Sequence, residues 1–419
     1  MTSRRRLVLL VGVAVTVVSV SPPAAASRQG SPLLVTTSAD VVDAGDGVLS
    51  LREAVDLANA DLGDDTIELG GLTAVLDRCD DEEEPGPYDE DGNVDGDLDA
   101  NDTAGSLTVR NGVVEQRCQH RILDGNTATV LTVQGVTITG GYVFRPGGGI
   151  ASAGPVVVED SLVTGNESEA AGGGIDAPDV VVRRSSITDN VTTDILGGGG
   201  GAGIRATRSV RLVDSVVSDN TVVFAGQGGG VRAPTVTVRR STITHNDTGY
   251  HQGSGAAVFG TRVVVTDSTI SDNRSPHGVG GIDAMGAVDL VRSTIVRNEA
   301  PEVANLAARG PLRARSSVIG EPHARGANCW IRGSVTSGGY NVVSVRGGCG
   351  LGAGAGDRIR QPRLDLRPLG ENGGPTPTHL PLGHRLSIVP PSRCGTSIDQ
   401  RGAPRPLGPW CEAGAVEVP

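Results

Sequence analysis

The stretch Ser241-Thr242-Ile243-Thr244-His245-Asn246 decides the fold, because the chain repeats its pattern six times between residues 161 and 298. Each copy reads Ser, any residue, Ile or Val, Thr or Ser (once Val), any residue, Asn. The copies are Ser161–Asn166, Ser185–Asn190, Ser215–Asn220, Ser241–Asn246, Ser268–Asn273 and Ser293–Asn298. A seventh, Ser316–Gly320, lacks the Asn, and the copies recur every 23 to 30 residues. A period of this size indicates stacked structural units.

Each repeat carries the alternation of buried strands. Before Ser241, for example, Val236 and Val238 alternate with polar residues. Ile243 lies two positions after Ser241. This period of two with β-branched residues predicts strands. A short Gly-Gly-Ile segment, as at 173–175, predicts one more strand per repeat. Three short strands in about 25 residues predict an all-β chain folded as a right-handed parallel β-helix, a pectate-lyase-like solenoid.

Stacking turns aligned positions into ladders. The Asn column predicts a ladder of amide hydrogen bonds. The residue just before each Ser alternates in sign: Asp160, Arg184, Asp214, Arg240, Asp267, Arg292. Opposite charges on neighbouring coils attract, so we interpret this column as structural. The alternative is a charged stripe that binds a ligand. The column just before each Asn could supply acid–base groups, with His245 between two aspartates, but we interpret its members as turn residues: Asp189, Asp219, His245, Asp272, Arg297.

The first residues have the pattern of an export signal. Three arginines, Arg4–Arg6, precede the apolar run Leu7–Val20 and the small residues Ala24–Ala26. This order predicts a signal peptide over residues 1–26. A retained membrane anchor is the alternative, which the short apolar run disfavours. No second long apolar run follows, so we expect a secreted mature chain without a transmembrane segment.

The composition restricts the partners and the compartment. A net charge of -12 disfavours nucleic-acid binding. The six cysteines are an even number, which in an exported chain predicts disulfides. Pairing between sequence neighbours is one of the fifteen possible connectivities, and it gives Cys79–Cys118, Cys329–Cys349 and Cys394–Cys411.

The N-terminal region predicts a small helix-containing cap. Ser50-Leu51-Arg52-Glu53 is a capping box that starts a helix over about Leu51–Asn59. Strands are expected near Leu34–Thr36 and Thr66–Leu69. One face of the helix is apolar: Leu51, Ala54, Val55, Ala58. We expect this helix to cover the open strand edges at the N-terminal end of the β-helix.

These terminal motifs carry a family resemblance. Val35-Thr36-Thr37 through Ser50–Ala54 resembles the CSLREA domain of exported bacterial proteins, with Leu49 at the position of the usual Cys. The tail resembles a choice-of-anchor Q domain in four motifs: Ser337–Asn341, Asn372–His379, Asp399–Pro406 and Gly414–Glu417. The resemblance implies a secreted or surface-displayed β-helix protein. Together, the residue patterns and the resemblance divide the chain into a signal peptide (1–26), a CSLREA-like cap (27–76), an acidic insert (77–104), β-helix repeats (105–328) and a choice-of-anchor-Q-like region (329–419).

The acidic insert contains a candidate calcium loop. Its spacing matches a twelve-residue loop with Gly96 at the sixth position and oxygen ligands from five residues. These ligands are Asp91, Asn93, Asp95, Asp97 and Asp102. The alternative is a solvated acidic loop without a bound ion.

Candidate site residues follow the Gly-Gly-Ile segments. One column reads Asp176, Arg205, Arg232, Phe259, Asp283, and neighbouring loops add Tyr250 and His251. Carboxylates, arginines and aromatic rings along one groove suit an acidic or neutral glycan. Catalytic candidates within this column are Asp176, Arg205, Arg232 and Asp283.

The sequence therefore predicts a secreted, cell-surface-associated protein with a structural, adhesive or glycan-binding role. Its expected partner is an extracellular or cell-wall polysaccharide. The alternative is a calcium-dependent polysaccharide lyase or glycoside hydrolase, because the β-helix fold also hosts such enzymes. No run of residues resembles the catalytic signatures of those enzymes, so the binding role is preferred.

Overall fold

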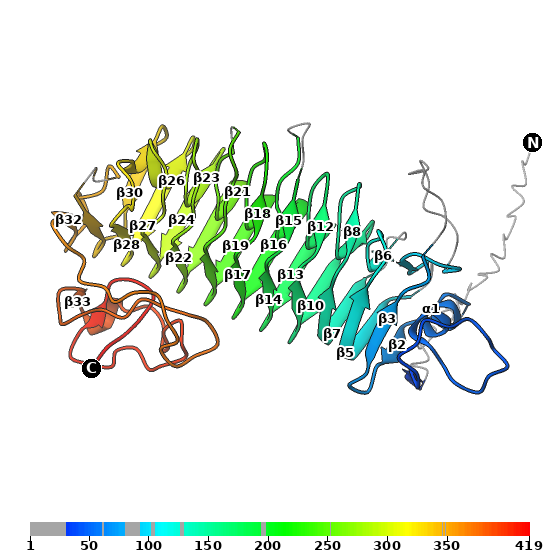
Figure 1. Cartoon of the computed structure of the whole chain (residues 1–419). Coiled ribbons are helices and arrows are strands. Elements are labelled where there is room, and N and C mark those ends of the chain that lie inside the picture. Colours follow the sequence, from blue (N-terminus) through cyan, green and yellow to red (C-terminus); the bar gives the residue numbers. More distant parts are fainter. Residues whose placement is uncertain are drawn as a thin grey trace, which may run out of the picture.

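The computed structural model describes most of the chain, namely residues 31–60, 63–79, 93–101, 105–125, 130–193, 198–251, 253–345, 347 and 349–419. It confirms a right-handed parallel β-helix (Figure 1). The predicted signal peptide lies outside the described residues, as does much of the acidic insert.

The Gly-Gly-Ile segments form the first face of the β-helix, which we call sheet I. Its strands are β4 (Leu98–Asp99), β6 (Leu123–Gly125), β9 (Ile150–Ser152), β23 (Ile282–Ala284), β26 (Val303–Ala308) and β29 (Ala327–Ile331). Four central coils instead have a long strand that bends from sheet I into the next face: β13 (Ile175–Arg183), β16 (Ile204–Val213), β19 (Val231–Arg239) and β21 (Val258–Thr266).

The second halves of these long strands belong to sheet II. The other strands of this sheet are β1 (Leu33–Leu34), β2 (Asp65–Glu68), β10 (Val156–Glu159), β24 (Val288–Val291), β27 (Leu312–Arg315) and β30 (Val335–Ser337). Its inward positions stack in strict register, as in the pairs Val156↔Val180 and Val236↔Val263. These aliphatic side chains are buried in one core that runs the length of the stack, as their alternation predicted.

The Ser-x-Ile segments form sheet III. Its strands are β3 (Thr73–Leu76), β11 (Leu162–Thr164), β14 (Ser186–Thr188), β17 (Val216–Ser218), β20 (Thr242–Thr244), β22 (Thr269–Ser271), β25 (Thr294–Val296), β28 (Val318–Gly320), β31 (Val342–Ser344) and β32 (Arg358–Gln361). Strands β5 (Leu107–Gln116) and β7 (Leu131–Thr139) run through sheets II and III. A narrow fourth sheet contains β8 (Tyr142–Val143), β12 (Glu167–Ser168), β15 (Val191–Thr192) and β18 (Thr221–Val222).

The predicted asparagine ladder is present in the core. Each Nδ2 donates to the Oδ1 of the Asn on the next coil, as from Asn220 to Asn246 (2.9 Å) and from Asn246 to Asn273 (2.9 Å). The side chains are fully buried. Beyond Asn298 the ladder continues through Asn305 and Asn328, which belong to sheet I strands.

The seventh repeat has a different register from the predicted one. The backbone N–H of Ser293 donates to the Oγ of Ser317, so Ser317 rather than Ser316 holds the serine column. Ser316 instead occupies the position before it, with a φ of 50°. Asn305 replaces the missing Asn of this repeat, because its Nδ2 donates to the carbonyl of Gly320.

The alternating charge column lies at a bend between sheets II and III. Its six Asp and Arg residues have φ between 46° and 52°, in the left-handed region. Their side chains form three bidentate ion pairs between adjacent coils: Asp160–Arg184, Asp214–Arg240 and Asp267–Arg292. The column just before the Asn also has positive φ, as at Asp219 (57°) and His245 (54°). The structure thus supports the interpretation of both columns as structural.

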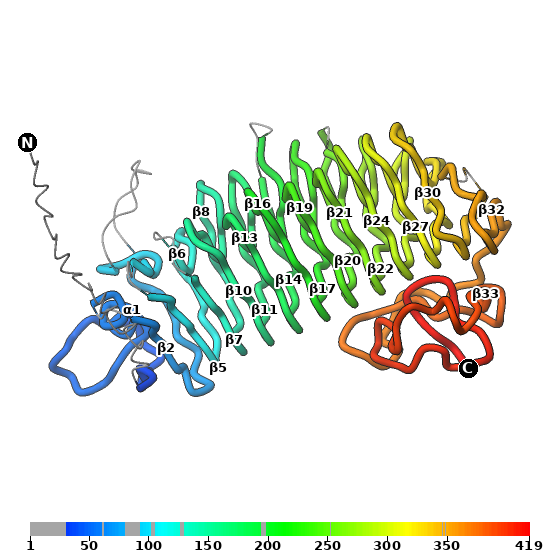
Figure 2. The backbone as a smooth tube through the Cα atoms, turned by 180° about the vertical axis from the view of Figure 1, so that it is seen from behind, coloured from blue at the N-terminus to red at the C-terminus, as the bar shows by residue number. Residues whose placement is uncertain are grey.

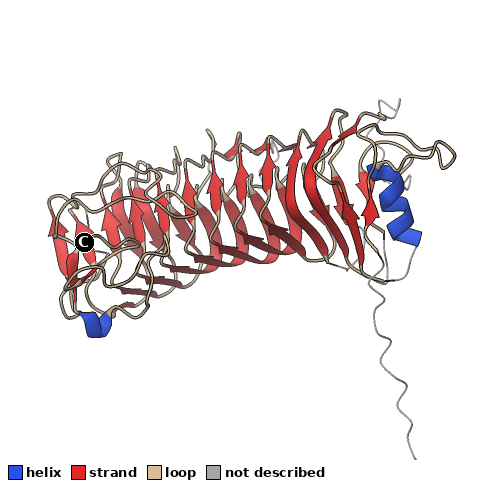
Figure 3. Cartoon of the chain, turned by 90° about the horizontal axis from the view of Figure 1, so that it is seen from below, coloured by secondary structure: helices blue, strands red, loops and turns tan. Residues whose placement is uncertain are grey.

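The N-terminal cap matches the predicted helix closely. Helix α1 spans Leu51–Ala60 and starts with the capping box. Glu53 N–H donates to Ser50 Oγ (3.1 Å), and Ser50 N–H donates to the Glu53 carboxylate (2.9 Å). The predicted apolar face is buried and extends the core of the β-helix. Figure 3 shows the helix at the N-terminal end of the stack.

The C-terminal region divides into two parts. The stack runs beyond residue 328 through β32, and Cys349 and Leu351 cover the end of the core. Residues 362–419, the C-terminal module, then fold back against sheet III (Figure 2). This module contains the antiparallel pair β33 (Ser387–Val389) and β34 (Cys411–Glu412) and a short 3-10 helix, η1 (Pro391–Arg393). It shares a second apolar core with Val296, Val318 and Val342 of the stack.

Three disulfides join sequence neighbours: Cys79–Cys118, Cys329–Cys349 and Cys394–Cys411. The first lies near the N-terminal end of the stack, the second at its C-terminal end, and the third within the C-terminal module. The cysteines thus lie where the repeats no longer stack on both sides.

Candidate ligand-binding face

Sheet I brings the predicted site column together on its outward-facing side, where neighbouring groups leave Asp283 only 6% exposed. Strand pairing aligns Asp176 with Arg205, Arg205 with Arg232, Arg232 with Phe259, and Phe259 with Asp283. The strands are only three or so residues long on this sheet, and the residues on either side of each column member point inward. These five side chains therefore form a single file along the β-helix axis.

An ion pair occupies the N-terminal part of the column. Arg205 Nη1 lies 2.8 Å from Asp176 Oδ1. Burial raises the pKa of the Asp176 carboxyl, although Arg205 and Arg121 oppose that shift. The burial of Asp176 thus favours the protonated form of its carboxyl, whereas the ion pair with Arg205 favours the charged form.

A groove lies where Arg232 meets Phe259. The Arg232 guanidinium carbon is 6.0 Å from the centroid of the Phe259 ring, a cation–π arrangement. Arg232 also donates to the backbone carbonyls of Gly198 and Gly199, which fix its orientation. The groove has a volume of about 340 Å³, and it is lined by Arg205, Ala206, Thr207, Arg232, Ala233, Pro234, Phe259, Gly260 and Thr261. An aromatic face beside guanidinium groups suits a polar ring with apolar faces.

Asp283 is the last residue of the column at its C-terminal end. Its Oδ2 accepts a hydrogen bond from Ser254 Oγ (2.6 Å), and Arg309 Nη1 lies 3.5 Å from its Oδ1. Four strand spacings of about 4.8 Å separate it from Asp176, which gives about 19 Å. Glycosidase carboxyl pairs are about 5 to 9.5 Å apart. Asp176 and Asp283 therefore do not form such a pair.

The variable loops border this column as expected. The loop that contains Gly198 contacts Arg232, and the loop that contains Ser254 contacts Asp283. Tyr250 is 70% exposed on the second of these loops, and the N–H of His251 donates to the carbonyl of Phe224. Phe224 is 40% exposed and lies beside His251. None of Phe224, Tyr250 and His251 lines the groove between Arg232 and Phe259. The sequence analysis missed Phe224 because it lies outside the repeated positions.

The candidate calcium loop is partly described. Asp91 and Asp102 lie outside the described residues. Asn93 is buried, and its side chain bonds the backbone N–H of Asp99 (2.6 Å) and the carboxylate of Asp56 (3.0 Å). No group of three or more His, Cys, Asp or Glu suited to a metal ion occurs among the described residues. Calcium binding stays a prediction.

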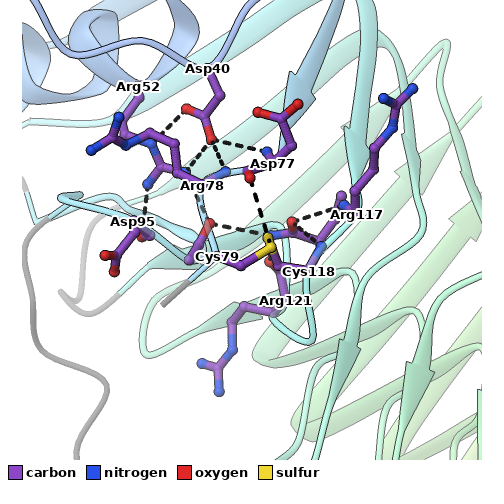
Figure 4. Close-up of a disulfide and its surroundings, with 11 residues drawn as sticks. Asp40, Arg52, Asp77, Arg78, Cys79, Asp95, Arg117, Cys118 and Arg121 are labelled. Atoms are coloured by element: carbon purple, nitrogen blue, oxygen red, sulfur yellow. Dashed lines mark hydrogen bonds and ion pairs between the residues drawn. A yellow bond between two sulfur atoms is a disulfide. The ribbon is translucent and has the colours of Figure 1, made fainter. Parts of the chain in front are cut away.

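Sequence reasoning missed a buried charged network beside this loop. Arg121 forms an ion pair with Asp124 and lies 3.6 Å from Asp97 Oδ2. Arg121 lies next to the Cys79–Cys118 disulfide (Figure 4). Strand pairing places Asp124 in the same file as Asp176, two strands earlier. The available signal was that Asp124 follows Leu123 as Asp176 follows Ile175.

No protein-family model, curated protein or solved structure matches this chain. Within the described ranges, no helix is long and apolar enough to cross a membrane.

Proposed function

We propose that this chain is a secreted, surface-associated β-helix protein that binds a glycan along sheet I. The observation that carries the proposal is the groove in which the Arg232 guanidinium lies over the Phe259 ring. Sugar rings have apolar faces for the aromatic ring and hydroxyl groups for the flanking arginines. The open file along the axis suits an extended chain of sugars.

Two further features support an extracellular role. Three disulfides favour an oxidising compartment. The resemblance of the cap to CSLREA domains and of the tail to choice-of-anchor Q domains implies export and surface display. A self-stacking rod with sealed ends also suits a structural or adhesive role.

A glycan panel tests the proposal. The mature chain is assayed for binding to immobilised neutral and acidic polysaccharides, together with the variants Phe259→Ala and Arg232→Gln. We expect each variant to bind its glycan at least about tenfold more weakly, because each removes one side of the groove. Phe144→Ala is the matched control, since Phe144 is an exposed aromatic residue outside the groove. Binding to no polysaccharide, or equal loss in the control, overturns the proposal.

A calcium-dependent lyase or glycoside hydrolase is the second candidate function. The placement of Asp176 and Asp124 in one file favours it, and burial raises the pKa of Asp176 in the direction that a general acid needs. Asp124 is two strand spacings away, about 10 Å between Cα atoms. Incubation of the same polysaccharides with the chain and calcium would then yield unsaturated products or new reducing ends. Turnover lost in Asp176→Asn and Arg205→Ala would establish the enzyme, whereas binding without turnover favours the first proposal.

A further inference from the structure

Three arginines on consecutive central coils of sheet II have no carboxylate partner among the described residues. These are Arg183 on β13, Arg211 on β16 and Arg239 on β19, which we call the arginine triad. Arg315 on β27 also lacks one, but it lies three coils beyond them. Most other arginines of the β-helix form ion pairs, as Arg184, Arg205, Arg208, Arg240 and Arg292 do. The triad therefore differs from most arginines of the β-helix, which pair with a carboxylate on a neighbouring coil.

Strand pairing places the triad on three consecutive coils. Arg183 pairs with Val213, two residues after Arg211, and Val213 in turn pairs with Arg239. Residues in register, and residues two apart on one strand, share a face of the sheet. Neighbouring members are thus about 8 Å apart, and Arg183 and Arg239 are about 10 Å apart, measured between Cα atoms. All three point outward, and Arg211 and Arg239 are exposed.

The nearby carboxylates are bound to other arginines. Glu159 is the register neighbour of Arg183, but its carboxylate lies 2.5 Å from Arg184 Nη2. Asp179, on the same strand as Arg183, pairs with Arg208 at 2.6 Å. Asp214, which adjoins Val213, pairs with Arg240. The chain has 48 acidic residues for 36 basic ones, yet three positive charges gather here without a partner.

We propose that the arginine triad binds an anionic polysaccharide through its carboxylate or sulfate groups. Guanidinium groups recognise such oxyanions with paired N–H donors. The triad lies on a flat face of sheet rather than in an enclosed pocket, so a polymer that spans several charges suits it better than a small anion. This site is separate from the proposed groove on sheet I and does not depend on it.

A polysaccharide fits this face better than a nucleic acid. The residues between the arginines are Val181, Val213 and Thr237, so the face offers no aromatic side chain for base stacking. A flat sheet also has no element that enters a DNA groove. The net charge of -12 further opposes a densely charged duplex.

Binding to polymers that differ only in charge tests the inference. The full chain is applied to immobilised dextran, dextran sulfate and polygalacturonate, and to single- and double-stranded DNA, over a series of NaCl concentrations. We expect retention on dextran sulfate, polygalacturonate or both, weakening with salt, and no retention on dextran. The sulfated and carboxylated polymers then distinguish which oxyanion is preferred.

Matched triple variants locate the site. The variant R183Q/R211Q/R239Q should lose at least about tenfold in affinity. The control R325Q/R360Q/R363Q removes three other exposed arginines and the same total charge, and it should bind like the unmodified chain. Phe259→Ala should also bind these polymers normally, which separates this inference from the proposed function. Equal binding by the two triple variants, no retention on either anionic polysaccharide, or tighter triad-dependent binding to DNA would overturn it.

Discussion

Arg52 and Asp40 form a fully buried ion pair that ties helix α1 to the acidic insert. Arg52 Nε lies 2.7 Å from Asp40 Oδ1, and Nη2 lies 2.9 Å from Oδ2 (Figure 4). The remaining Arg52 donors bond the backbone carbonyls of Asp95, Gly96 and Asp97. Asp40 also accepts the backbone N–H groups of Asp77 and Arg78. One pair of side chains thus joins helix α1 and the segment around Asp40 to residues 77–78 and 95–97.

Asp40→Asn should destabilise the protein strongly. The substitution leaves the Arg52 charge buried without a counterion, which typically costs about 3 to 5 kcal/mol. Urea unfolding of both forms measures the difference in the free energy of unfolding. Glu371→Gln serves as the control, since it also removes one negative charge but from an exposed side chain. A loss in Asp40→Asn no larger than in the control would show that the pair contributes little.

Asn246→Ala tests the asparagine ladder. Its Nδ2 donates to Val217 O, Thr244 O and Asn273 Oδ1, and its Oδ1 accepts from the backbone and side chain of Asn220. Removing these bonds leaves buried polar groups unpaired, so we expect a loss of about 3 kcal/mol or more.

Two other substitutions calibrate the ladder variant in the same urea titration. Asn246→Asp should be more destabilising than the alanine variant, because a carboxylate would face the carbonyl oxygens of Val217 and Thr244. Asn101→Ala, at an exposed position, should change little. If Asn246→Ala behaved like Asn101→Ala, the ladder would have no energetic role.

The C-terminal module should lose stability as the pH rises toward 8. Burial, together with the neighbouring Glu412, raises the pKa of Glu417 to about 8, although Arg405 Nη1 lies 2.8 Å away. The folded state therefore binds a proton more tightly than the unfolded chain, whose glutamate pKa is 4.5. This contribution is fully present below pH 4.5 and is lost as the pH rises from 4.5 to about 8.

Hydrogen exchange over residues 399–417, measured between pH 5 and pH 8, can follow this loss after correction for the intrinsic exchange rate. Glu417→Gln cannot ionise, so its module should show a flatter dependence of protection on pH across that window. An unchanged slope in the variant would assign the dependence to another group.

Loss of the Cys329–Cys349 disulfide should loosen the C-terminal end of the stack. The bond closes a 20-residue separation and holds Cys349 and Leu351 over the last coil. Its removal in C329S/C349S should cost about 3 kcal/mol. Exchange should quicken first in β29 and β30, while β13 and β16 in the central coils keep their protection. Uniform loss of protection along the stack would contradict this local role.

Repetition explains how far the sequence could predict this structure. Each of the six repeats has an aliphatic residue at the positions equivalent to Val236, Val238 and Ile243. Alignment of the repeats was therefore enough to predict the strand pairing and the core. The alignment was wrong at Ser316, where the repeat has lost its Asn. Ser317 instead occupies the serine position of that coil. Nor could the alignment show that Asn305, from another strand, would continue the ladder.

The candidate site was predictable only in part, for a similar reason. The Gly-Gly-Ile offset placed Asp176, Arg205 and Arg232 in one file, because the offset fixes the strand register. Their partners come from loops of irregular length, such as the carbonyl of Gly198. The docking of the C-terminal module on sheet III likewise depends on contacts between distant residues, such as Thr269 with Gln400. No local pattern encodes these contacts.

The bidentate Asp–Arg pairs also set a rule for how this rod can change in length. Because they join coils two by two, as in Asp160–Arg184 and Asp214–Arg240, the electrostatic unit is a pair of coils. Deletion of one of the four inner coils of this column, or duplication of any of its six coils, would bring two like charges together and interrupt the alternation. Gain or loss of two adjacent coils would leave every charged residue of the column with a partner of opposite charge. Viable length variants of this protein should therefore differ by even numbers of coils.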